Sequence, residues 1–178
     1  TCQTIQDIQS SLLTKNTRLF SQTGDSVVVS ATTTETSIID GGVGSLSVSS
    51  NGFSIGDSFR GVIGGILSNQ NNNTIRVRLK SGSVVLADSG VQTLGGHTND
   101  IFKLEVDFTI RNIGSGGTGS IITLGTFHTT KKNSGDVTGF GFEFVNDTTF
   151  DTTTSNTLDI TVEWGTSSSN NSIKSQVF

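Results

Sequence analysis

The residues of this chain that could perform acid–base or metal chemistry are two histidines, one cysteine and a small set of carboxylates. His97 and His128 are the only histidines, and Cys2 is the only cysteine. A transition-metal site needs several such ligands at close spacing, which the sequence does not offer. His128 lies in a strand pattern rather than in a loop, where a catalytic base would be poised beside a serine. The sequence therefore predicts neither a metal centre nor a serine hydrolase, and no cofactor.

Carboxylates on the polar sides of alternating strands are the remaining catalytic candidates: Glu105, Asp107, Asp159 and Glu163. A facing pair of carboxylates could support glycoside hydrolysis. However, Arg76, Arg78 and Lys80 occupy the same kind of strand face. Cross-strand ion pairing on a solvated sheet explains these charges more simply, so that an enzyme is the least favoured class.

Two further motifs are weak. Asp147 and Asp151 lie in a hydroxyl-rich stretch that could supply oxygen ligands to calcium, but the stretch lacks the dense carboxylates of a dedicated site. Sequons for N-glycosylation occur at Asn72, Asn146 and Asn170. A chain so rich in Asn, Ser and Thr produces such sequons by chance.

Composition excludes several other classes of partner. The net charge is -4 and the sequence pI is near 5.0, which gives no basic surface for nucleic acid. No apolar run approaches the length that spans a bilayer, so membrane insertion is not expected. The 178 residues suit one compact domain, and the turns must be built from Gly, Asn, Asp and Ser because there is no proline.

The elements that must position any site are strands. From Thr17 onward, apolar and polar residues alternate with a period of two, most clearly at residues 74–80, 102–112, 139–144 and 157–164. Less regular strands are expected near residues 26–32, 36–40, 44–49, 57–69, 83–90, 120–130 and 171–178. The Gly64-Gly65 pair inside one of them indicates a bulge or a close backbone approach. The pattern predicts an all-β fold, a two-sheet antiparallel jelly-roll sandwich.

The N-terminal residues differ from the rest. Ile5, Ile8 and Leu12 are spaced as one stripe of a helix, which predicts a short helical stub or stalk over residues 1–16 and a β domain over residues 17–178. The stub is too short to hold a coiled coil alone, and it could equally pack on its own domain or fray.

The strands contain more apolar residues than the core of one thin sandwich needs. The segment VIGGIL has apolar residues on both strand faces, and GFGFEF aligns three rings on one face. We therefore name candidate residues for a trimer interface in the stub and in these two segments. They are Ile5, Ile8, Leu12, Val62, Ile66, Phe140, Phe142 and Phe144. For the phenylalanines, ordinary core packing is the alternative. Trp164, the only tryptophan, is expected to anchor the core rather than to present a sugar-binding platform.

Five segments together resemble the jelly-roll modules of virion-surface fibres and spikes, which recur in tailed phages and large double-stranded DNA viruses. They are ATTTETSII, GSLSVSSNGFSIGDSFR, IRVRLKSGSVVLADSG, FKLEVDFTIRNIGSGGTGSIITLGTF and DTTTSNTLDITVEWGTSSSNNSI. The resemblance covers nearly all residues after Thr17. It lies in the order of these segments and in their amino-acid composition.

The resemblance implies a non-enzymatic, trimeric, tumour-necrosis-factor-like head on the virion surface. Such a head would contact other virion proteins through its N-terminus and, for host attachment, a host surface receptor or glycan. At most a stub of stalk is present in residues 1–16, which puts capsid anchoring in doubt. The alternative function is a carbohydrate-binding or cytokine-like sandwich unconnected with a particle.

Overall fold

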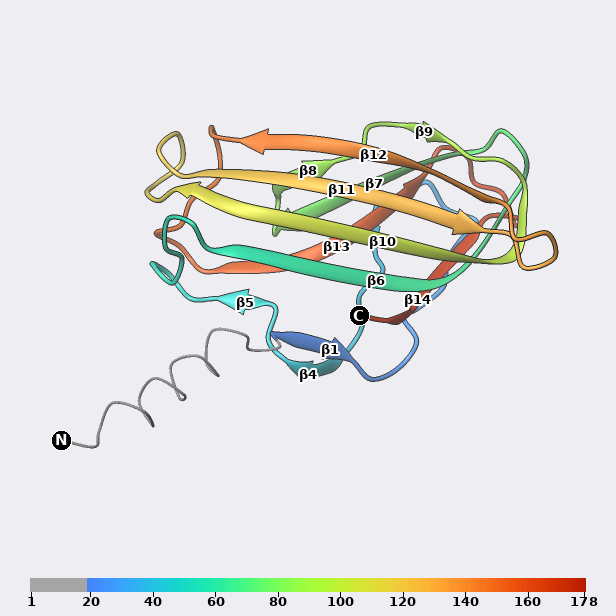
Figure 1. Ribbon diagram of the computed structural model, residues 1–178, viewed down its shortest axis with the longest axis horizontal. Helices are drawn as coiled ribbons and strands as arrows, with labels where there is room; N and C mark the ends of the chain where they lie inside the picture. Colours follow the sequence, from blue (N-terminus) through green and yellow to red (C-terminus); the bar gives the residue numbers. More distant parts are fainter. Residues whose placement is uncertain (1–18) are drawn as a thin grey trace.

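The computed structural model describes residues 19–178, and all the regular structure in this part of the chain is β-strand (Figure 1). The long strands are β6 (Ser58–Asn69), β7 (Thr74–Ser81), β10 (His97–Asn112), β11 (Ser120–Thr130), β12 (Val137–Asn146) and β13 (Asn156–Trp164). Shorter strands are β1 (Phe20–Gln22), β2 (Val29–Ser30), β3 (Thr36–Ser37), β4 (Gly42–Gly44), β5 (Ser47–Val48), β8 (Val84–Asp88), β9 (Gln92–Thr93) and β14 (Ser172–Val177). The all-β prediction is confirmed. The predicted stub over residues 1–16 lies outside the described residues.

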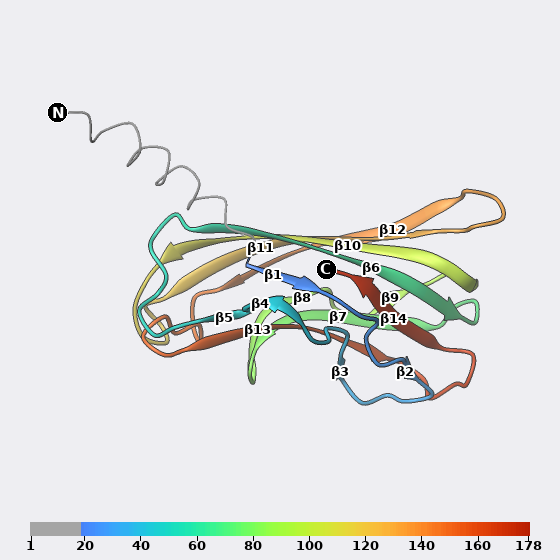
Figure 2. The same ribbon diagram turned by 90° about the horizontal axis from the view of Figure 1, so that it is seen from below.

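The strands form two main sheets that face each other. The first sheet has the order β12-β11-β10-β6-β14-β2, and the second has β3-β13-β7-β8, with β5 beside β13 and β9 beside β7. Every pairing is antiparallel. Figure 2 shows the sheets as two layers of a sandwich, and β1 pairs with β4 in a small additional ribbon.

Alternation along the strands explains which side chains fill the core. In β10, Phe102, Leu104 and Val106 are buried, whereas the residues between them are exposed or half-buried. In β7, Ile75, Val77 and Leu79 are buried in the same way. Since each strand sends alternate side chains to one side, the inner faces of both sheets combine in one apolar core.

The last two strands belong to different sheets. β13 lies in the second sheet, between β3 and β7, whereas β14 lies in the first, between β6 and β2. Gly65 of β6 faces β14 so closely that a Cβ there would overlap the backbone of Lys174, and the register of β14 shifts by one residue between Ser175 and Val177. A close backbone approach, as expected for the Gly64-Gly65 pair, lets β14 enter the sheet.

Candidate functional site

The five described positions named for a trimer interface do not share one surface. Val62 and Ile66 of β6 point away from the core, on the outer face of the first sheet. Phe140, Phe142 and Phe144 of β12 are half-buried against the core. The Phe140 ring stacks on Phe127 with centroids 5.0 Å apart, and Phe127 stacks on Phe102 at 5.6 Å. Ile5, Ile8 and Leu12 lie outside the described residues.

The outer face of the first sheet carries a group of exposed apolar side chains, of which the sequence singled out Val62 alone. Val62, Ile101, Leu124, Val137 and Val145 are 37 to 62% exposed and come from four adjacent strands. Monomeric soluble proteins seldom expose large contiguous apolar patches, whereas single exposed apolar residues are common. We refer to these five residues as the outer apolar face.

Glycines of β12 and β6 lie within this surface and have no side chains that project from the sheet. Gly139 pairs with His128 and Gly141 pairs with Thr126, so that two positions of β12 have no side chain to stand above the sheet. Gly64 of β6 pairs with Lys103 in the same way. The surface is therefore low at these glycines, whereas Lys103 and Glu105 form an exposed ion pair beside them.

Trp164 is fully buried. Its indole Nε1 donates a hydrogen bond to the carbonyl of Val29 over 3.2 Å. The bond satisfies the one polar group of the side chain, as burial requires. The exposed large hydrophobic side chains of the described residues include no aromatic ring.

The four candidate carboxylates are divided between two surfaces on opposite sides of the molecule. Glu105 and Asp107 lie on the outer side of the first sheet, where both contact Arg60. Asp159 and Glu163 lie on the outer side of the second sheet, where Ser37 donates to Asp159 over 2.6 Å. The arrangement provides ion pairs and hydrogen bonds, not a facing pair of carboxylates around a substrate.

Arg78 is the centre of the ion pairs on the second sheet. Its side chain is 11% exposed and contacts Glu163 at 2.8 Å, Glu35 at 3.1 Å and Asp88 at 3.3 Å. Arg76 also binds Asp88. Burial raises the pKa of Asp88, but the hydrogen bond from Arg76, the Gly90 amide and the two guanidinium charges outweigh this effect, so the pKa lies below its usual value.

A buried trio of polar residues was not predicted from the sequence. His97 Nδ1 lies 3.0 Å from Asp100 Oδ2, and His97 Nε2 lies 3.2 Å from Thr129 Oγ1. Residues three apart in a regular strand point to opposite faces. Here the register of β10 shifts between His97 and Asp100, and Asn99 has a φ of 51°, so that a bulge turns both side chains inward.

The trio has the connectivity of a carboxylate–imidazole–hydroxyl triad, but it lacks access. Thr129 is 0% exposed, and its hydroxyl also contacts Thr138 Oγ1 at 2.8 Å. None of the three residues lines either of the two cavities described in this fold. The Lys132 amide donates to Asp100 over 3.0 Å. The trio therefore fastens the β11–β12 turn to the bulge of β10, and its role is structural.

Sequence reasoning also missed a G-x-S-x-G string, at residues 52–56. A nucleophile elbow joins a strand to a helix, whereas this turn leads into strand β6. Ser54 is exposed, and its amide donates to Asp57 over 2.8 Å. His97 pairs with Asn69 at the opposite end of β6, too far away to act as the base.

The sequons differ in accessibility. Asn146 is buried, and its amide nitrogen donates to the Val85 carbonyl and the Thr149 hydroxyl, each over 2.8 Å. It holds the loop after β12 and cannot carry a glycan in this fold. Asn72 and Asn170 are exposed in turns.

Acidic residues of the described part do not assemble into a metal site. Among residues 19–178, no group of three or more His, Cys, Asp or Glu side chains is arranged so that it could hold a metal ion. Asp151 Oδ1 accepts hydrogen bonds from the amide and the hydroxyl of Thr153, so this carboxylate is engaged within its own turn. Over the same residues, no helix is long and apolar enough to cross a membrane.

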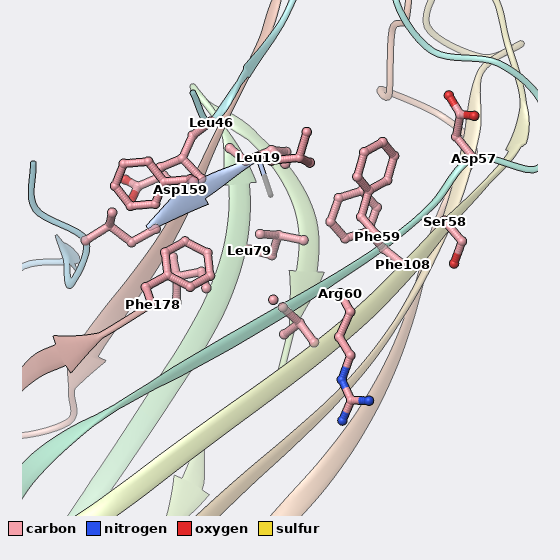
Figure 3. Close-up of a pocket in the computed structure, with 16 residues that line it drawn as sticks. Leu19, Leu46, Asp57, Ser58, Phe59, Arg60, Leu79, Phe108, Asp159 and Phe178 are labelled. Atoms are coloured by element: carbon pink, nitrogen blue, oxygen red, sulfur yellow. The ribbon is translucent and has the colours of Figure 1, made fainter. Parts of the chain in front are cut away.

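A cleft of about 630 Å³ opens between the two sheets at the side where β14 ends. Leu79, Val106, Phe108 and Ile160 are buried residues of its lining. Figure 3 shows Phe59 and Phe108 on one side of the cleft and Leu46 and Phe178 on the other. The volume and the apolar lining are typical of sites that bind small ligands or peptide side chains.

No family model, no curated protein and no solved structure matches the chain.

Proposed function

We propose that this chain is a non-enzymatic structural protein of a virion surface, the jelly-roll head of a fibre or spike, and that it forms a homotrimer that takes part in host attachment. The observation that carries the proposal is the outer apolar face, five exposed apolar side chains on a sheet surface that also carries the ion pairs of Arg60, Lys103, Glu105 and Asp107. Burial of this face around a threefold axis would stabilise a trimer by about 25 cal/mol per Å².

The connection of the strands supports the jelly-roll assignment. β13 belongs to the second sheet, and the next strand, β14, belongs to the first. A chain that passes from one antiparallel sheet to the facing sheet between consecutive strands is typical of jelly rolls and of other Greek-key sandwiches.

Repetition of loops supports the attachment role. A trimer presents each loop three times, so that weak single contacts with a repeated receptor gain avidity without a deep polar pocket. A carbohydrate-binding module is less well supported, because no exposed aromatic ring among residues 19–178 offers a platform for a sugar.

Light scattering after size-exclusion chromatography at micromolar concentration tests the trimer. We expect three times the chain mass of 18.6 kDa. Leu124→Glu and Ile101→Glu place charges on the outer apolar face and should give monomers. Val91→Glu is the matched control, since Val91 is 66% exposed away from this face. A wild-type mass of one chain would refute the trimer.

Immunogold labelling of intact particles tests the virion assignment separately. Antibody against the β domain should label the particle surface. A folded trimer that is absent from particles would leave a binding module as the better assignment.

A further inference from the structure

Strand β12 lies at one edge of the first sheet and is the longest strand at any edge of the two main sheets (Figure 1). It has ten residues, whereas the strands at the other edges, β2, β3 and β8, have two, two and five. Among residues 19–178, β11 is the only strand that pairs with β12. The pairing runs from Val137 to Asn146 without a register shift, so the open side of β12 is regular along its whole length.

The open side of β12 carries little protection against pairing with another strand. Soluble proteins protect long edge strands with proline, with bulges or with charged side chains, because unpaired backbone groups recruit other strands. The chain has no proline, and the β11–β12 ladder has no bulge. Glu143 is the one charged residue of the strand. The edge is therefore suited to pairing.

The register of the β11–β12 hairpin shows which backbone groups face the open side. The Lys131 amide donates to the Asp136 carbonyl over 2.9 Å, so these two residues form a hydrogen-bonded pair. Such pairs alternate with non-hydrogen-bonded pairs along an antiparallel ladder, so the even-numbered residues of β12 bond to β11. The odd-numbered residues direct their N–H and C=O groups to the open side, and they are Val137, Gly139, Gly141, Glu143 and Val145.

The sequence of β12 complements itself when a second copy pairs with it in the antiparallel direction about Gly141. In this register Val137 lies opposite Val145 of the second copy, and Phe140 lies opposite Phe142 of the second copy. All five odd-numbered residues then face odd-numbered residues, and each such pair exchanges two hydrogen bonds. A register centred on Phe140 or on Phe142 would pair only four of the five.

Charge complementarity favours the same register. Glu143 comes to lie opposite Gly139 of the second copy, which has no side chain to block it. Gly139 pairs with His128, which is exposed, and His128 pairs with Lys103. Two strand spacings separate Glu143 from His128 of the second copy, about 10 Å, which the two side chains together can span. The contact forms twice, because the arrangement has two-fold symmetry.

We propose that β12 pairs with β12 of a second copy of this chain, so that two first sheets become one continuous antiparallel sheet. On its inner side, the half-buried rings of Phe140 and Phe142 pack against those of the second copy. The contact is carried by the backbone edge, and it goes beyond the proposed trimer, which is carried by the outer apolar face. Ten residues from each copy are fewer than the roughly 20 to 30 of a stable interface, so we expect a weak dimer with a Kd on the order of 0.1 mM.

Sedimentation equilibrium of the Ile101→Glu variant tests this dimer in the absence of the trimer. Ile101 belongs to β10, two strands away from the open side of β12. The mass should rise from nearly one chain of 18.6 kDa at about 10 µM to nearly two chains at about 1 mM. Amide hydrogen exchange at the same two concentrations locates the contact. The amides of Gly139, Gly141 and Glu143 should gain protection at the higher concentration, whereas that of Phe142 is protected at both, since it bonds to β11.

Two lysine substitutions in the same background test the edge. A Cβ on Gly141 would meet only the Gly125 carbonyl, at 3.7 Å, so the monomer accommodates a side chain there. Gly141→Lys places two like charges opposite each other at the two-fold axis and should raise the Kd at least about tenfold. Thr126→Lys is the matched control, since Thr126 pairs with Gly141 and lies one strand further from the edge. Its charges are about 14 Å apart across the dimer, and the Kd should change less than about threefold.

An exchange of charges tests the register. Glu143→Lys and His128→Glu should each raise the Kd about tenfold, because each opposes a like charge or removes the attraction across Gly139. The double variant should return to within about threefold of the starting Kd, since the exchanged charges attract each other again. Absence of this recovery would refute the register, and with it the proposed pairing.

Three further results would overturn the proposal. The first is a mass of one chain at about 1 mM. The second is a dimer in which the amides of Gly139, Gly141 and Glu143 gain no protection, which would assign the association to another surface. The third is an equal effect of Gly141→Lys and Thr126→Lys. If Gly141→Lys does not fold, the charge exchange and the amide protection still decide.

Discussion

The indole nitrogen of Trp164 donates to the Val29 carbonyl over 3.2 Å, and this bond joins β13 of the second sheet to β2 at the margin of the first. Trp164→Ala should lower the free energy of unfolding by about 3 to 5 kcal/mol, because it leaves a cavity in the core. Trp164→Phe keeps much of the ring volume and loses the hydrogen bond to the Val29 carbonyl, and should cost less. Urea denaturation measures both. A loss below about 1 kcal/mol for alanine would contradict the buried position.

Two glycines of β12 should respond differently to alanine. A Cβ on Gly139 would overlap the backbone carbonyl of Phe127, which cannot move without disturbing the β11–β12 ladder. A Cβ on Gly141 would meet only the Gly125 carbonyl, at 3.7 Å. We expect Gly139→Ala to cost about 1 to 3 kcal/mol and Gly141→Ala to be nearly neutral. Equal melting temperatures for the two variants would contradict this difference.

Asp100 should make stability depend on acid pH. Burial raises the pKa of its carboxyl, but hydrogen bonds from the Lys132 amide, His97 and the Thr98 amide hold the pKa below its ordinary value. Because the folded pKa is the lower one, the carboxylate contributes stability above the unfolded pKa of about 3.9, and this contribution disappears as the pH falls through the folded pKa.

The comparison of wild type with Asp100→Asn measures this contribution. The variant should be less stable near neutral pH, and the difference should shrink below about pH 4. Asp147→Asn is the control, since Asp147 is exposed. A difference that stays constant from neutral pH to about pH 2 would show that charge on Asp100 is not its cause.

Two arginines in ion pairs should differ in importance. Arg78 is nearly buried between three carboxylates, whereas the side chain of Arg60 is 61% exposed. Removal of one partner from a buried pair costs about 3 to 5 kcal/mol, and removal from an exposed pair about 0 to 1 kcal/mol. Arg78→Met should therefore destabilise much more than Arg60→Met in chemical denaturation. Comparable losses would show that burial does not govern these pairs.

The sequence predicts strands best where one face is buried. In β7, β10 and β13 the apolar residues alternate almost without interruption and most of them are buried, although Arg78 and Thr161 on the polar faces are buried too. The short strands β1, β4 and β9 have only two or three residues, which is too few for a period to be recognised.

The parts that could not be predicted depend on distant contacts or on irregular backbone. His97 and Asp100 meet because of a bulge at Asn99, and an alternating pattern assigns them to opposite faces. The outer apolar face joins Val62 to Leu124 and Val145 across strands whose order the sequence does not reveal. The cleft depends on where β14 leaves β6, which is likewise a property of the assembled sheet.

The position of β14 governs when the fold can be completed during synthesis. The strand lies between β6 and β2 in the first sheet, so residues near the start and the middle of the chain are bridged by residues 172–177. Until those residues leave the ribosome, β6 keeps an open edge along its whole length and β2 has no partner. Sheets built from such distant segments fold slowly, and an open edge invites pairing with other nascent chains. We therefore expect association between nascent copies to compete with folding until residues 172–177 have been synthesised.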